Sequence, residues 1–139
     1  MRYLGLDIGD RWIGIALSDP SAKLASPHTI LKRSNDTTDS EAINHIIEKY
    51  DVRLIVVGLP RMMDGNLGIQ ARKVEDFTQQ LRSKIDIPIE FRDERLTTVS
   101  AQRLMRVSCN RRSRKNRDDA IAAAIMLQAF LDERQDLSI

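Results

Sequence analysis

The chain has few of the residues that build disulfides, zinc sites and nucleophilic triads. It has one cysteine among its 139 residues, Cys109. That residue cannot form an internal disulfide, and without paired ligands nearby it indicates no zinc site. The two histidines, His28 and His45, neighbour no Ser or Cys motif of a covalent enzyme. The GxxxxGK[ST] pattern is absent as well, so an ATPase with that phosphate-binding loop is not expected.

Long apolar runs are also missing. No apolar stretch approaches the ~20 residues that a membrane helix needs, and the N-terminus lacks the basic-then-apolar pattern of a signal peptide. Together with the single cysteine, this favours the reducing cytoplasm and no membrane partner. Apolar residues make up 42% and charged residues 30% of the chain, as in ordinary soluble proteins. A single domain over residues 1–139 is expected.

The net charge of +2 conceals an uneven distribution. Residues 106–117 contain no acid and hold six bases: Arg106, Arg111, Arg112, Arg114, Lys115 and Arg117. Of the 22 bases in the chain, 16 remain elsewhere against 20 acids, so the rest of the protein carries −4. A concentrated basic segment on an acidic body indicates a polyanionic partner. The alternative is a solvated loop with no partner.

Apolar patterning predicts strands first and then alternating helices and strands. Residues 2–8 and 11–18 predict a hairpin, and residues 23–31 predict a third strand with Pro27 at its edge. Further along, the pattern predicts helices over 38–49 and 69–85, strands over 54–60 and 87–94, a short helix from Thr97 or Thr98 to Met105, and a long helix after the basic segment, over 118–133. This order predicts an α/β fold with a five-stranded mixed sheet, three antiparallel strands and then two parallel ones, flanked by helices.

Acidic residues occur at the ends of three of these elements. Asp7 ends the first strand, Asp93 and Glu94 end the last strand, and Asp118 and Asp119 begin the last helix. In such sheets functional groups gather at the carboxyl ends of strands. A set of carboxylate oxygens suits Mg²⁺ or Mn²⁺. Two such ions ~4 Å apart can activate a water and stabilise the leaving oxygen of a phosphodiester.

Each of these acids also has a purely structural interpretation. Asp7 could accept hydrogen bonds from turn amides, and Glu94 could pair with Arg92 or Arg95. Either aspartate of the last helix could cap it and interact with its positive end. Taken together, and beside a basic segment, the three acidic clusters favour a metal site.

Four segments resemble, in this order along the chain, the YqgF family, whose members are also described as Holliday-junction-resolvase-like proteins and as nucleases for pre-16S rRNA. The segments are LDIGDRWIGIALSD, VVGLPRMMDG, FRDERLTTVSA and RDDAIAAAIML. The resemblance covers essentially the whole chain. Its most specific part is DERLTT, placed between GLPxxxDG and a late Asp-Ala helix.

The resemblance implies an RNase H-like fold and a divalent-metal phosphodiesterase site. Carried over by position, the family's acids fall on Asp7, Glu94 and Asp119. Trp12 stands where a basic residue is usual, which implies that one nucleic-acid contact is missing or is replaced by stacking. The basic segment 106–117 agrees in character with the family's mobile loop before the last helix.

Residues and resemblance together predict a cytoplasmic endonuclease that uses Mg²⁺ or Mn²⁺, with two ions, on structured RNA. The choice of substrate, the 5′ end of pre-16S rRNA, rests on the resemblance alone. The six bases of residues 106–117 would hold phosphates, which gives affinity but little sequence choice. One alternative is a Holliday junction resolvase for branched DNA, which should act as a dimer. Another is a non-catalytic nucleic-acid-binding factor linked to transcription. The chain itself is compatible with a monomer or a weak homodimer.

Overall fold

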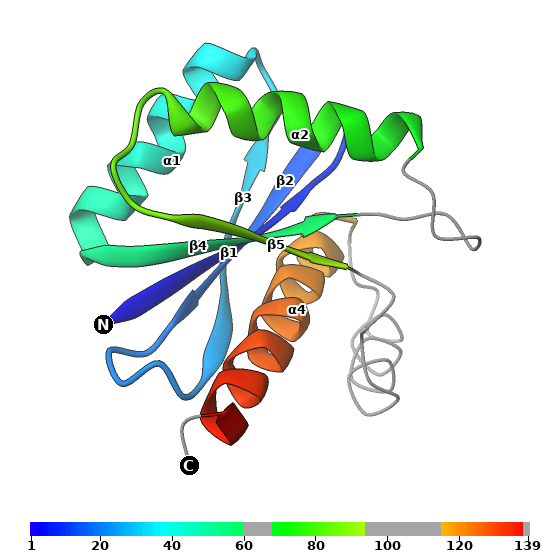
Figure 1. Ribbon diagram of the computed structural model, residues 1–139. Helices are drawn as coiled ribbons and strands as arrows, with labels where there is room; N and C mark the ends of the chain where they lie inside the picture. Colours follow the sequence, from blue (N-terminus) through cyan, green and yellow to red (C-terminus); the bar gives the residue numbers. More distant parts are fainter. Residues whose placement is uncertain (60–67, 94–114, 138–139) are drawn as a thin grey trace.

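A computed structural model describes residues 1–59, 68–93 and 115–137, with side chains of the last stretch described for residues 120–134. Within these residues the chain forms one mixed sheet, with strand order β3-β2-β1-β4-β5, and helices on both faces (Figure 1). The strands are β1 (Arg2–Ile8), β2 (Trp12–Ser18), β3 (Ala25–Lys32), β4 (Val52–Leu59) and β5 (Ile89–Asp93), and the helices are α1 (Asp36–Tyr50), α2 (Ile69–Arg82) and α4 (Lys115–Leu137).

Strand pairing confirms the predicted mixed sheet. β1 pairs antiparallel with β2, and β2 pairs antiparallel with β3. On the other side β1 pairs parallel with β4, and β4 pairs parallel with β5. The carboxyl ends of β1, β4 and β5 therefore lie along one edge of the sheet, which we call the carboxyl edge (Ile8, Leu59 and Asp93). The start of α4 lies at the same edge (Figure 1).

The two faces of the sheet carry different cores because side chains alternate along each strand. Leu4 and Leu6 of β1 are fully buried in the core beneath α1 and α2. Tyr3 points to the opposite face, where it packs with Leu127 and Leu131 of α4. Both faces are therefore covered, which explains the continuous apolar run of β4.

α4 crosses β1 at very close range. A Cβ atom built on Gly5 would lie 3.0 Å from Cβ of Leu127 and 3.1 Å from the carbonyl oxygen of Ala123. A side chain at position 5 would press against Leu127 and the helix backbone, so the close approach favours glycine on the strand. The crossing shows that the last helix covers the sheet near its first strand, and it restricts how α4 is aligned with β1.

Element boundaries differ from the predicted ones by a few residues. α1 begins at Asp36 instead of residue 38 because the Asn35 side chain caps it, accepting a hydrogen bond of 2.8 Å from the Thr38 backbone N–H. α2 ends at Arg82 instead of residue 85. α4 begins at Lys115, so the last three residues of the basic segment are helical. The short helix predicted to end at Met105 lies outside the described residues. None of the described helices is long and apolar enough to cross a membrane.

Candidate functional site

Asp7 is the one predicted site residue whose side chain the structure describes. It is the second-last residue of β1, at the carboxyl edge, and it is half-buried. By alternation it shares a face with Tyr3 and Gly5, both of which contact α4. Asp7 is therefore on the α4 face of the sheet, the face that the last helix covers.

Glycines flank Asp7 on both neighbouring strands. Gly14 of β2 is its direct partner in the antiparallel ladder. On the other side Leu6 pairs with Val57, so Asp7 is level with Gly58 of β4. In-register neighbours point to the same face of a sheet, and neither glycine has a side chain. At the level of Asp7, the two neighbouring strands therefore present only backbone atoms on the α4 face. We call these two glycine positions the bare floor beside Asp7.

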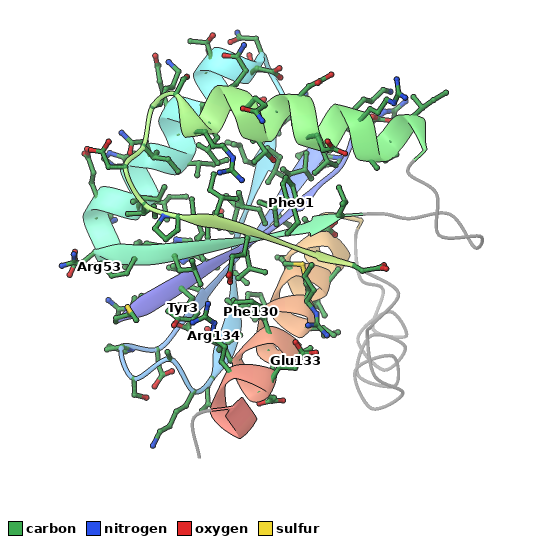
Figure 2. All side chains as sticks on the ribbon, in the orientation of Figure 1. Tyr3, Arg53, Phe91, Phe130, Glu133 and Arg134 are labelled. Atoms are coloured by element: carbon green, nitrogen blue, oxygen red, sulfur yellow. The ribbon has the colours of Figure 1, made fainter. Side chains whose placement is uncertain are left out.

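The alignment of α4 brings the N-terminal part of the helix toward Asp7. Tyr3 of β1 contacts Phe130, with ring centroids 6.1 Å apart, whereas Gly5 contacts Ala123 and Leu127. Helix and strand thus run in opposite directions, as Figure 2 shows for Tyr3 and Phe130 toward the far end of α4. Two more strand residues advance about 6.6 Å, and four helix residues cover about 6 Å. That step leads from Gly5 to Asp7 on the strand, and from Leu127 and Ala123 to positions 123 and 119 on the helix.

Helix position 118 falls on a different side of α4. Successive residues of a helix are about 100° apart, so position 118 shares its side with Ala122 and Ile125 rather than with Ala123. The sequence alone did not decide between Asp118 and Asp119, because the residues that share a side of the helix with each of them are apolar. The contact between Gly5 and Ala123 favours position 119. The side chains of both aspartates lie outside the described residues.

Glu94 lies outside the described residues, but the strand that leads to it is described. Two residues of β5 reach toward α4: Arg92 donates to Glu133 over 2.5 Å, and Glu90 accepts from Arg134 over 3.0 Å. Positions 90 and 92 are thus on the α4 face.

Arg92 is a neighbour of the site that the sequence analysis considered only as a partner for Glu94. Its side chain is buried, and its guanidinium contacts Glu133 of α4. Arg92 is the register partner of Gly58, so Asp7, Gly58 and Arg92 are level on three adjacent strands. Only the strand order brings position 92 level with Asp7, and the local sequence does not show that order.

Arg33 is the second residue that sequence reasoning missed. Its Nη1 donates to the carbonyl of Gly9 over 3.0 Å, and its Nε donates to the buried Asp39 over 3.0 Å. The turn after Asp7 is thereby tied to the start of α1. A glycine is needed in this turn because a Cβ at Gly9 would lie 3.1 Å from the carbonyl oxygen of Trp12. No local pattern marks Arg33, since its partners come from two other parts of the chain.

Most of the predicted phosphate contacts lie outside the described residues, namely Arg106, Arg111, Arg112 and Arg114. Lys115 and Arg117 occupy the first turn of α4, at the carboxyl edge, although their side chains are not described. Among the side chains that are described, no three His, Cys, Asp or Glu residues form a metal-binding group. Of the three predicted ligands only Asp7 belongs to that set.

Comparison with known proteins gives one family and full-length relatives. Residues 1–133 match the family model RuvX, described as a Holliday junction resolvase. A protein of Thermoanaerobacter pseudethanolicus named "Putative pre-16S rRNA nuclease" is 45% identical over 138 residues, which cover 98% of this chain and 99% of that protein. A protein of the same name from Roseiflexus sp. (strain RS-1) is 47% identical over 135 residues, with 96% of each covered.

Two Holliday junction resolvases are among the solved structures with a similar backbone. RuvC of T. thermophilus, solved in complex with a Holliday junction substrate, gives a TM-score of 0.68 at 14% identity, covering 98% of this chain and 96% of RuvC. The fowlpox virus resolvase, solved with Holliday junction DNA, gives 0.59 at 11% identity, covering 96% of this chain and 99% of the other. At such identities the likeness shows the fold alone, and it confirms the predicted RNase H-like fold.

Proposed function

Because this chain belongs to the RuvX family of Holliday junction resolvases, also called the YqgF family, we propose that it is a cytoplasmic endonuclease that depends on Mg²⁺ or Mn²⁺. Its residues 1–139 form a single domain, and it hydrolyses phosphodiesters in structured RNA. Its substrate is the 5′ end of pre-16S rRNA. The relatives described above, which carry this RNA in their names, support the choice of substrate.

The observation that carries the proposal is the place of Asp7. Its carboxylate is at the carboxyl edge, on the face covered by α4 and between two glycines. A carboxylate that served only the turn would not require glycines on both neighbouring strands. A site that must admit metal ions and a phosphate close to the sheet does require such a floor.

The proposed metal ligands are Asp7, Glu94 and Asp119. All three are carboxylates, and this donor set fits Mg²⁺ or Mn²⁺ better than softer metals. When bound, two such ions supply activation of the attacking water and stabilisation of the leaving oxygen. The chain's own task is to hold three like charges together on one face of the sheet.

The proposed phosphate contacts are the bases of residues 106–117: Arg106, Arg111, Arg112, Arg114, Lys115 and Arg117. The start of α4 carries the last of them to the carboxyl edge, next to the proposed metal ligands. Bases there hold the backbone of the nucleic acid and so position one phosphodiester over Asp7, with little choice of sequence.

The second candidate function is a Holliday junction resolvase acting on branched DNA. The description of the matching family favours it, and it uses the same site and the same chemistry. It differs in the assembly it requires, because two symmetric cuts need two copies of the site. The third possibility, a nucleic-acid-binding factor without catalysis, would use the basic segment alone.

A cleavage assay with purified protein tests these functions against one another. The substrates are a precursor rRNA 5′ end and a four-way DNA junction, each with Mg²⁺, Mn²⁺ or EDTA. We expect metal-dependent cuts in the RNA and none with EDTA. We also expect Asp7→Asn to fold like the parent and to lose cleavage, because asparagine keeps the shape but not the charge that holds a metal.

Each other outcome identifies an alternative. Paired cuts in the DNA junction alone would assign the resolvase function. Binding of either substrate without cleavage by the parent protein would indicate the non-catalytic factor. A folded Asp7→Asn variant with unchanged metal-dependent turnover would remove the nuclease assignment from this site. Circular dichroism and thermal unfolding of the variant provide the control for folding.

A further inference from the structure

Trp12, the single tryptophan of the chain, lies next to Asp7 on the same face of the sheet. It is the first residue of β2 and precedes Gly14 by two positions, so both point toward the α4 face. Gly14 is the ladder partner of Asp7. Trp12 is therefore the diagonal neighbour of Asp7, at a Cα distance of about 7–8 Å. Trp12 is therefore further than Gly14 toward the carboxyl edge, next to the candidate catalytic carboxylate.

Trp12 is only half-buried. Hydrogen bonds at and beside the residue fix its backbone. The carbonyl of Trp12 accepts a hydrogen bond of 2.9 Å from Gly9, and Lys32 pairs with Trp12 across β3. The backbone N–H of Arg33 donates to the carbonyl of Arg11 over 2.8 Å, next to Trp12. A large apolar ring on a fixed strand, with part of its surface exposed, loses little conformational freedom when a flat partner covers it.

The surroundings of the ring combine apolar surface and positive charge. Arg11 and Lys32, both exposed, flank Trp12 along the chain and across the sheet. On the same face, beside Gly14, a pocket of about 280 Å³ opens between β3 and the start of α4, with mostly apolar walls. Its lining residues are Pro27, His28, Thr29, Ile30, Ala120 and Ile121. Aromatic rings between basic side chains are the surface that binds unpaired nucleotides.

We propose that Trp12 is a stacking platform for one unpaired base of the nucleic acid bound at Asp7. This inference rests on the proposed nuclease function and deepens it, since it assigns a base contact next to the phosphodiester to be cut. Stacking needs a free π-face, so the site selects single-stranded or splayed nucleotides over bases in a continuous duplex. It does not select sequence, because every base has a π-face.

Fluorescence of Trp12 tests the proposal directly, because the chain has no other tryptophan. The protein carries Asp7→Asn so that the RNA stays intact. The probes are a single-stranded oligoribonucleotide of mixed sequence and a blunt RNA duplex of the same length. We expect the single strand to quench the emission strongly at saturation. We expect the duplex to leave it nearly unchanged.

Variants then show whether the ring contributes to affinity. In the same background, Trp12→Leu should weaken binding of the single strand by between about 5-fold and 150-fold, the range for stacking of one base on an aromatic ring. Trp12→Phe keeps an aromatic ring and should retain most of the affinity. Phe91→Leu is the matched control, since Phe91 is an aromatic residue with 39% exposure on the opposite face, and it should change nothing.

The possible failures are distinguishable. Unchanged emission on saturation with the single strand, together with parental affinity in Trp12→Leu, would overturn the stacking role and leave the nuclease function intact. Equal quenching by single strand and duplex would overturn the preference for unpaired bases. If neither RNA binds the parent protein, the proposed function itself fails, and the stacking role with it.

Discussion

Asp19, which directly follows β2, holds the connection to β3 through hydrogen bonds. Its side chain accepts from the backbone N–H groups of Leu24, at 2.9 Å, and Lys23, at 2.8 Å, and also from the hydroxyl of Ser21. The bond from Leu24, followed by those from Ser21 and Lys23, holds the pKa of Asp19 well below its usual range. These bonds are made to the ionised carboxylate, so the loop is most stable when Asp19 is charged.

We therefore predict a pH-dependent contribution of Asp19 to stability. Because its pKa is lower in the folded protein than in the unfolded chain, the contribution is complete above the unfolded pKa of about 3.9. It is lost as the pH falls below that value. Urea unfolding between pH 7 and pH 3 should show a smaller loss of unfolding free energy in Asp19→Asn than in the parent. Asp86→Asn, which removes an exposed aspartate elsewhere, is the control and should follow the parent curve.

Asp7 and Asp19 show how far single residues can be interpreted from sequence. Both are aspartates next to the end of a strand, and the local sequence alone predicts a role in a turn for each of them. What separates them in the structure is register: Asp7 has Gly14 and Gly58 beside it and a helix above it. Register depends on pairings between distant segments, so the bare floor around Asp7 and the level position of Arg92 had no local signal.

At the scale of elements, apolar periodicity was sufficient for the order of strands and helices and for the mixed sheet. It was weaker at element ends, where single hydrogen bonds decide. The Asn35 cap lets α1 begin at Asp36, before the predicted residue 38. α4 begins early as well and includes three residues of the basic segment. The family resemblance proposed Asp119 over Asp118, and the crossing of α4 over Gly5 supplies the physical reason, which periodicity lacked.

That crossing leads to a prediction for the two aspartates of α4. Asp119→Asn should abolish cleavage, because position 119 belongs to the side of α4 that crosses β1 at Gly5, and the variant loses a charge needed for the metal. Asp118→Asn should retain most activity. Since α4 begins at Lys115, Asp118 is not its N-cap, and its interaction with the positive end of the helix contributes only about 0.3–1 kcal/mol. Single-turnover rates in Mn²⁺ compare the two variants.

The two variants are controls for one another, because each removes one negative charge from adjacent positions. The reverse pattern, with activity lost in Asp118→Asn, would move the ligand to position 118. Equal and small losses in both would argue that α4 contributes no metal ligand. Thermal unfolding should show similar midpoints for both, so that a difference in rate is not a difference in folding.

At the scale of the whole molecule, the two ends of α4 have different tasks. Toward its C-terminal end the helix is fastened to the sheet by aromatic and ionic contacts. The guanidinium of Arg134 lies 5.8 Å from the ring centroid of Tyr3 and 5.1 Å from that of Phe130, and it pairs with Glu90 at 3.0 Å (Figure 2). The start of the helix is at the carboxyl edge, where glycines replace large side chains. Among the described residues, the aromatic and ionic contacts of Arg134 thus hold α4 to the sheet away from the proposed site.

Charge is distributed unevenly along the chain, and this leads to a prediction about the salt dependence of binding. The basic segment carries +6 on a body of −4, and its end reaches the carboxyl edge through Lys115. Replacing Arg111, Arg112, Arg114 and Lys115 by alanine should weaken binding of RNA and DNA alike. The slope of log affinity against log salt should fall by roughly 0.7–0.9 for each phosphate that the variant no longer neutralises. Binding titrations between low and moderate salt measure that slope.

A second quadruple variant separates local contacts from net charge. Lys23, Lys49, Arg53 and Arg82 are exposed at the edge of the sheet opposite to the carboxyl edge, as Figure 2 shows for Arg53. Their replacement by alanine changes the net charge by the same amount. If phosphates are held at the carboxyl edge, this control should keep nearly the parental slope, because charges beyond a Debye length of about 10 Å are largely screened. An equal fall of the slope in both variants would mean that the nucleic acid responds to total charge, and the basic segment would then not be the phosphate-binding site.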